Sequence, residues 1–219
     1  HEFKGFGIPR SHRVSLMEEG LDVLKLCFAG EPFSYEGKRY QFSDVVITPG
    51  YVQEGGPPLW IATMSEAGAD RVARHDAHIL PQGLRERAFK PWVEALETSG
   101  RSPDHYRKGI IRSVLVTDDL DREWGRVRTA ERYRMQLYRR FFEESNEGFG
   151  EEGEAIPQTW IVGNVSECID QLESFIRAFG ITDLVTMAVP PGMPVDALNH
   201  SHEQLFKVVI PQLKDRLKA

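Results

Sequence analysis

Short apolar runs alternate along this chain with longer stretches in which apolar residues recur every three or four positions. Residues 59–62, 77–80, 110–116 and 182–189 are short apolar runs, of which the third is rich in β-branched residues, and they predict four strands. The helical spacing predicts helices over 11–30, 66–74, 85–99, 120–145 and 165–179, and from Leu198 onward. Pro211 is expected to kink or break the last of these.

Two segments depart from this alternation. Residues 33–42 alternate aromatic and polar side chains around Glu36-Gly37-Lys38, which predicts a β-hairpin. Residues 160–163 form a further short apolar piece before Asn164, which has capping-box spacing to Glu167. Ser15 and Glu18 have the same spacing near the start of the first helix.

The stretch from Pro57 to Arg74 predicts a strand, a tight turn and a helix. Ser65 stands where a helix N-cap belongs, and Glu66 suits the positive end of the helix. Free backbone N–H groups at such an end can bind a phosphate. The same pattern is also typical of an ordinary strand–helix unit with a normal cap, and the local sequence leaves both interpretations open.

Strands that alternate with helices predict a parallel α/β sheet, as in a (β/α)8 TIM barrel or a doubly wound sheet. A barrel needs eight strands and typically about 250 residues, whereas four strands are clear in these 219 residues. The chain opens without an initiator Met, at a sequence that resembles the middle of a longer protein. We therefore expect residues 1–219 to form a single domain, the C-terminal portion of a barrel whose N-terminal strands precede His1.

Composition narrows the function classes. The 27 Lys and Arg residues are outnumbered by 33 Asp and Glu residues, for a net charge of −6, which argues against nucleic-acid binding. The Arg-rich helix over 120–145 also carries acidic residues, which favours a solvated helix at a subunit contact. No membrane span or signal peptide is evident, and two distant cysteines, Cys27 and Cys168, suggest buried free thiols in a reducing cytoplasm.

Four segments in order resemble the bacterial luciferase-like flavin monooxygenase family. The resemblance is carried by Glu2-Phe3-Lys4-Gly5-Phe6-Gly7-Ile8-Pro9, by Gly30 to Tyr40, by Pro57 to Arg74, and by Val162-Gly163-Asn164 with the closing Pro191-Gly192-Met193-Pro194. It implies a luciferase-like TIM barrel and a monooxygenase that oxidises a small organic substrate with O2 and reduced flavin. A deazaflavin-dependent hydride-transfer enzyme, a non-catalytic flavin-binding protein and an incomplete barrel remain alternatives.

The resemblance also implies a place for the cofactor. The strand over 59–62 resembles the family's fifth strand, and the turn after it resembles the flavin-phosphate cradle, so the resemblance implies Ala62, Thr63, Met64, Ser65 and Glu66 as the FMN-binding residues. Many family members have glycines where this chain has Ala62 and Thr63, which leaves FMN and a deazaflavin both open. The family's catalytic His lies in the N-terminal half, so the catalytic residues here are unknown.

Further expectations concern partners and metals. The resemblance implies a flavin reductase as a partner and a homodimer. Residues 145–157 are expected to be a loop that contributes to a lid. His75 and His78 are expected to have local packing roles, and Arg112, early in its strand, a structural one. His200 and His202 have a loose metal-like spacing without a third ligand, so no metal is expected.

Overall fold

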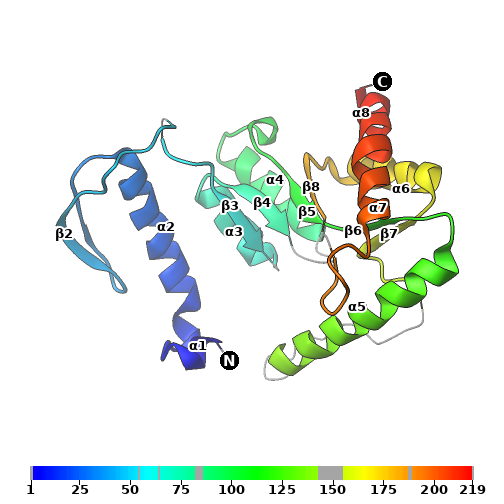
Figure 1. The fold of residues 1–219 in the computed structure, drawn as a ribbon. Coiled ribbons are helices and arrows are strands. Elements are labelled where there is room, and N and C mark those ends of the chain that lie inside the picture. The colour runs from blue at the N-terminus through cyan, green and yellow to red at the C-terminus, as the bar shows by residue number, and fades with distance from the viewer. Residues whose placement is uncertain are drawn as a thin grey trace. The chain divides into compact units, whose positions relative to one another are not determined.

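The computed structural model describes residues 2–53, 55–63, 65–81, 86–142, 155–186 and 189–218. The chain divides into two compact units, His1–Leu59 and Trp60–Ala219 (Figure 1). The expectation of a single domain within a longer barrel therefore stays a prediction.

The first unit consists of helices followed by a hairpin. A short helix α1 (Glu2–Gly5) and a 3-10 turn η1 (Arg10–His12) precede α2 (Arg13–Ala29), and Gly30 ends α2 in the left-handed conformation at φ 74°. Strands β1 (Phe33–Glu36) and β2 (Gln41–Val45) pair antiparallel, which confirms the predicted hairpin. The predicted capping box at Ser15 is wrong, because His12 is the N-cap and the Ser15 hydroxyl donates to the His12 carbonyl at 3.1 Å.

The second unit holds three pairs of parallel strands, as expected for an α/β fold. Strand β3 (Trp60–Thr63) pairs with β4 (His78–Pro81), β5 (Gly109–Ile111) with β8 (Asp183–Val185), and β6 (Ser113–Val116) with β7 (Trp160–Gly163). An isolated parallel bridge, Ile79 opposite Lys108, joins β4 to the chain leading into β5. The short apolar piece at 160–163 is thus a strand, and the predicted strand over 182–189 is shorter than expected, with residues 187–188 outside the described residues.

The single strand predicted over 110–116 is wrong, because the chain changes partner at Arg112. The Arg112 N–H donates to the carbonyl of Val185, the last residue of β8, at 2.9 Å, whereas the Ser113 N–H donates to the carbonyl of Thr159, directly before β7, at 3.0 Å. The Arg112 side chain is buried, pairs with Glu86 and stacks over the Phe175 ring at 4.7 Å. Burial lowers the pKa of Arg112. These contacts place Arg112 in the packed layer of the fold, in agreement with a structural role.

Helices cover one face of β3 and β4. The 3-10 turn η2 (Glu86–Ala88) leads into α4 (Phe89–Thr98), which packs beside α3 (Glu66–Arg74) (Figure 1). Ile61 and Ile79 point to this side and are buried, as are Val72, Trp92 and Leu96 on the two helices. A 3-10 turn η3 (Pro103–His105) then leads towards β5.

The second half of the unit has its own core. Helix α5 (Leu120–Phe142) occupies the described part of the helix predicted over 120–145, whose residues 143–145 lie outside the described residues. Helix α6 (Val165–Phe179) begins with the predicted Asn164–Glu167 capping box and ends at Gly180. Cys168 lies within the core formed by β6, β7, α6 and the C-terminal helix, whereas Cys27 is only partly buried; neither forms a disulfide. The predicted loop at 145–157 lies mostly outside the described residues.

The C-terminal helix accommodates Pro211 without breaking. Helix α7 (Asn199–Gln204) passes into a π-helical segment η5 (Leu205–Val209) and then into α8 (Ile210–Lys218) (Figure 1). Proline lacks the N–H of an α-helical hydrogen bond and its ring crowds the preceding turn. We attribute the π segment to this crowding, since a wider turn directly before Pro211 relieves it.

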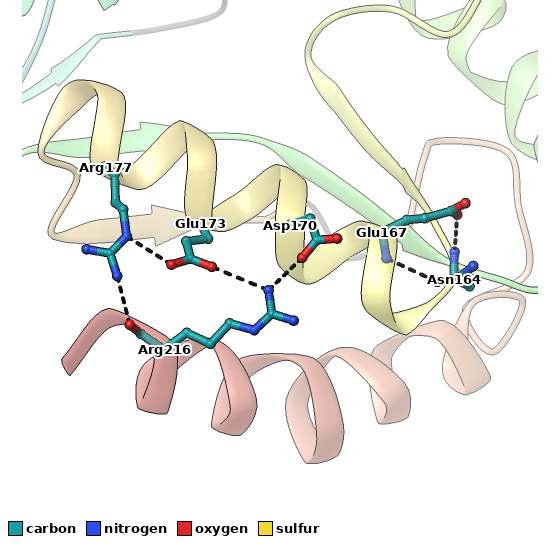
Figure 2. Close-up of polar contacts among 6 residues, drawn as sticks. All are labelled: Asn164, Glu167, Asp170, Glu173, Arg177 and Arg216. Carbon is teal, nitrogen blue, oxygen red and sulfur yellow. Dashed lines mark hydrogen bonds and ion pairs between the residues drawn. The ribbon is translucent and has the colours of Figure 1, made fainter. Parts of the chain in front are cut away.

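Ion pairs hold α8 against α6. Arg216 donates to Asp170 at 2.5 Å and lies 3.4 Å from Glu173, and Arg177 donates both to Glu173 at 2.9 Å and to the Arg216 carbonyl at 2.8 Å (Figure 2). Leu172 and Leu213 are buried in the same core. The α6–α8 ion-pair network therefore borders a hydrophobic contact.

The described residues form an α/β arrangement but no closed barrel. The TIM barrel and its missing N-terminal strands stay predictions. Across the described ranges, none of the helices is long and apolar enough to cross a membrane.

Candidate cofactor site

The candidate site is the turn in which β3 passes into α3. Side chains alternate along β3, so that Ile61 and Thr63 face the helices and are buried while Ala62 is exposed on the opposite face. Ala62 lies beside Leu80 of β4. Thr63, the last residue of β3, therefore points towards the helices.

Ser65 begins the helix as predicted. Its backbone is extended (φ −147°, ψ 162°), and its hydroxyl oxygen accepts the Gly68 N–H at 3.1 Å. The Ser65 carbonyl accepts the Ala69 N–H at 3.0 Å, the first bond of the helix. The N–H groups of Glu66 and Ala67 belong to the first turn, which has no intrahelical acceptor for them, and both residues are exposed.

Thr63 holds this turn from inside. Only 5% of Thr63 is exposed, its hydroxyl donates to the Ser65 carbonyl at 3.1 Å, and it accepts the Ser65 N–H at 3.4 Å. Gly68 makes room for it, because a Cβ at Gly68 would overlap the Thr63 hydroxyl and lie 3.3 Å from the Ser65 hydroxyl. Sequence reasoning missed Gly68, although a glycine three residues after a Ser N-cap was visible.

The structure therefore separates the five predicted residues. Thr63 and Ser65 meet in one hydrogen-bonded turn, Glu66 opens the helix, Ala62 lies on the opposite face of the strand, and Met64 lies outside the described residues. An anion here would meet the Ser65 hydroxyl and the first N–H groups of α3 at the positive end of the helix dipole. The Glu66 carboxylate would repel it, so Glu66 can contribute only its backbone N–H.

A second hollow lies at the carboxyl ends of β6 and β7. Its volume is about 560 Å3, and its lining includes Thr117, Asp118, Asn164 and Glu167. The Asn164 N–H donates to Glu167 Oε2 at 2.9 Å, and the Glu167 N–H donates to Asn164 Oδ1 at 3.0 Å. These two residues thus use their polar groups on each other as a helix cap, and the acidic lining does not suit a phosphate.

Within the described parts of the chain, neither Cys168 nor a cluster of metal ligands adds a reactive group to the turn between β3 and α3. Burial, reinforced by Glu167, raises the pKa of the Cys168 thiol to about 12, so the thiolate that a nucleophile requires does not form at neutral pH. Among the residues that the structure describes, no three His, Cys, Asp or Glu side chains are placed to hold a metal ion.

The comparisons with known proteins agree with this fold. The luciferase-like monooxygenase family matches residues 1–183, and the chain belongs to that family. An FMNH2-dependent dimethylsulfone monooxygenase from Pseudomonas putida is 22% identical over 184 residues, which are 80% of this chain and 49% of that protein. The chain thus spans about half the length of this relative.

Solved structures show the same fold. The monooxygenase RslO1 from Streptomyces bottropensis matches with a TM-score of 0.77 and 17% identity over 96% of this chain and 65% of its own. An F420-dependent secondary alcohol dehydrogenase, solved with an F420-acetone adduct, matches with a TM-score of 0.69 and 15% identity over 93% of this chain and 63% of its own. Both a monooxygenase and an F420-dependent dehydrogenase therefore share this fold.

Proposed function

We propose that this chain belongs to a flavin-dependent monooxygenase that oxidises a small organic substrate with O2 and reduced FMN. We further propose that the turn between β3 and α3 holds the flavin phosphate. The observation that carries the proposal is the Ser65-capped helix directly after a strand, within the region that matches the luciferase-like family. The FMNH2 dependence of the dimethylsulfone monooxygenase supports FMN as the cofactor.

In this proposal each group in the turn has a distinct task. The Ser65 hydroxyl and the N–H groups of Glu66 and Ala67 bind the phosphate, while Thr63 fixes the turn from below. Bound FMN would supply the redox chemistry, and the protein would orient the cofactor and exclude water. Ala62 and Met64 stay expected neighbours of the cofactor.

We also propose a flavin reductase as electron donor, a homodimer and a cytoplasmic location.

Ser65 gives a direct test, because two substitutions preserve the helix cap and differ in charge. Asp and Asn are both good N-caps. Ser65→Asp would place a carboxylate beside the phosphate, and about 2 kcal/mol of repulsion corresponds to roughly 30-fold weaker FMN binding. We expect Ser65→Asn to bind FMN far more tightly than Ser65→Asp, as measured by quenching of flavin fluorescence.

Riboflavin, which lacks the phosphate, is the matched ligand control. Its affinity should be equal in the two variants, since the added carboxylate has no phosphate to repel. Equal FMN affinity of Ser65→Asp and Ser65→Asn would place the phosphate elsewhere. A wild-type protein that binds FMN no better than riboflavin would refute a phosphate site in this chain.

The second candidate is a deazaflavin-dependent hydride-transfer oxidoreductase. The fold shared with the F420-dependent secondary alcohol dehydrogenase favours it. The test is to titrate the protein with each cofactor and to measure binding from the cofactor's absorption band. Tighter binding of coenzyme F420 than of FMN would select this candidate over the monooxygenase. A protein that binds neither cofactor would leave the incomplete barrel, and one that binds a flavin without turnover would leave the non-catalytic flavin-binding protein.

A further inference from the structure

The amino-terminal ends of β3, β4, β5 and β8 meet in a cluster, whereas the proposed cofactor turn follows the carboxyl end of β3. We call the cluster the N-terminal clasp; its members are Trp60, His78, Tyr106, Arg107 and Asp183. Trp60 opens β3, His78 opens β4, Asp183 opens β8, and Tyr106 and Arg107 precede β5. The clasp therefore spans the join between the β3–β4 pair and the β5–β8 pair.

Arg107 connects these strands in three ways. Its guanidinium makes two hydrogen bonds to the Asp183 carboxylate, of which the bond from Nε is 2.8 Å long. It also lies over the Trp60 ring at 5.5 Å, within cation–π range. Finally, its backbone carbonyl accepts the Ile79 N–H at 3.2 Å, beside the bridge that links β4 to the chain leading into β5.

His78 completes the join as a hydrogen-bond acceptor. The Arg107 backbone N–H donates to His78 Nδ1 at 3.2 Å, which requires that this nitrogen carry no proton. The imidazole contacts the Trp60 ring edge-to-face at 4.8 Å, and the Tyr106 ring lies at 6.2 Å. The packed geometry thus selects the neutral imidazole.

The charges around His78 act in both directions. Burial lowers the pKa of His78 and the Arg107 guanidinium lowers it further, while Asp183 and Asp76 oppose both. Each of these two carboxylates already accepts hydrogen bonds from other side chains. Asp183 accepts both bonds from Arg107, and Asp76 accepts from the Tyr106 hydroxyl and from Arg101 at 3.2 Å.

We propose that the N-terminal clasp is an acid-sensitive joint, in which protonation of His78 removes the acceptor for the Arg107 N–H and loosens the β3–β4 pair from the β5–β8 pair. A protonated imidazole would also be a second cation beside the Arg107 guanidinium. The pKa of His78 lies lower in the folded chain than in the unfolded chain. Between these two pKa values the unfolded chain therefore binds more protons than the folded chain. Stability accordingly rises with pH in this range, and this contribution is lost as the pH falls below about 6.5, the ordinary histidine value, towards the lower pKa of the folded chain.

The test compares the full chain with His78→Asn. The Asn side chain can place an acceptor oxygen near the position of Nδ1 and does not titrate in this range. We expect the Tm of the wild type to fall between pH 7.5 and pH 5.5, and the Tm of His78→Asn to fall less. His200→Asn, which changes an exposed histidine of α7, should follow the wild type.

NMR on the wild type supplies a second measurement that does not depend on a variant. The His78 ring should titrate below about 6.5, the ordinary value, and the Arg107 amide resonance should shift with the same midpoint. A His78 pKa at or above the ordinary value would overturn the proposal, as would an Arg107 amide resonance that does not shift when His78 titrates. So would an equal loss of Tm in the wild type and in His78→Asn.

Discussion

At the residue scale, Thr63 and Gly68 are coupled through the space they share. Ala in place of Gly within a helix normally stabilises a protein by about 0.5–1 kcal/mol. At Gly68 the added Cβ would overlap the Thr63 hydroxyl, and overpacking costs roughly 1–3 kcal/mol. We expect Gly68→Ala to lower the free energy of unfolding, measured by urea denaturation.

A matched glycine provides the control for this prediction. Gly125 lies inside α5, and a Cβ there would meet nothing within 4 Å, so Gly125→Ala should be neutral or stabilising. Thr63→Ala removes the overlapping hydroxyl and leaves Cβ at 3.1 Å from the new atom. Gly68→Ala should therefore cost less in the Thr63→Ala background, and strict additivity of the two substitutions would contradict the coupling.

At the element scale, the α6–α8 ion-pair network should make the attachment of α8 sensitive to acid. Hydrogen bonds from Arg177 and from Arg216 lower the pKa of Glu173. A carboxylate with a lowered pKa in the folded state stabilises the protein above its unfolded pKa of about 4.3, and this contribution is lost as the pH falls through the folded value. We expect Glu173→Gln to have a lower Tm than the wild type at pH 7, and the difference in Tm to shrink as the pH falls to about 3.

Glu203 is the comparison for this network. It pairs with Lys207 at 3.3 Å within one helical stretch, so it links no two helices. Glu203→Gln should change the Tm at pH 7 less than Glu173→Gln does, because exposed i,i+4 pairs contribute little. High salt should narrow the difference between the two variants. A Glu173→Gln effect that is equal at pH 7 and pH 3 would show that charge is not its origin.

Elements with local signals were predictable from the sequence, and elements set by distant partners were not. The Ser65 cap, the Asn164–Glu167 capping box and Gly180 each act within a few residues, and the structure has all three. The break at Arg112 depends on which strands, β8 and β7, lie beside the chain, and nothing within residues 110–116 records that choice. The π segment before Pro211 likewise depends on distant contacts. The C-terminal helix packs against the core on both sides of Pro211, so it continues through the proline instead of ending there.

The candidate site shows the same division. The prediction that the site follows β3 rested on the strand, the Ser65 cap and the family resemblance. The match to residues 1–183 confirms the family, and the position of the site stays a prediction. The inward role of Thr63 could not be predicted, since a hydroxylated residue in a turn can face a ligand or its own backbone. The role of Gly68 follows only once the turn is closed around Thr63.

At the scale of the whole molecule, the two units differ in how much side-chain burial supports them. Between residues 2 and 59, Leu21 is the one buried residue among those described, whereas the second unit contains two extensive cores. Large apolar side chains of the first unit are exposed, including Phe6, Val14, Met17 and Leu24. Segments with little buried apolar surface open at low free-energy cost.

We therefore expect hydrogen exchange in the full chain to divide at the boundary of the two units. Amides of α2 and of the β1–β2 hairpin should exchange at least about tenfold faster than those of β6, β7 and α6, as read by mass spectrometry of peptides after exchange.

The proposed homodimer makes a prediction of its own. If a second copy of the chain covered the exposed apolar side chains of α2, the amides of α2 would be protected from exchange. In that case protection of α2 should fall on dilution while protection of α6 stays constant. Equal protection of both units at every protein concentration would contradict the low intrinsic stability of the first unit.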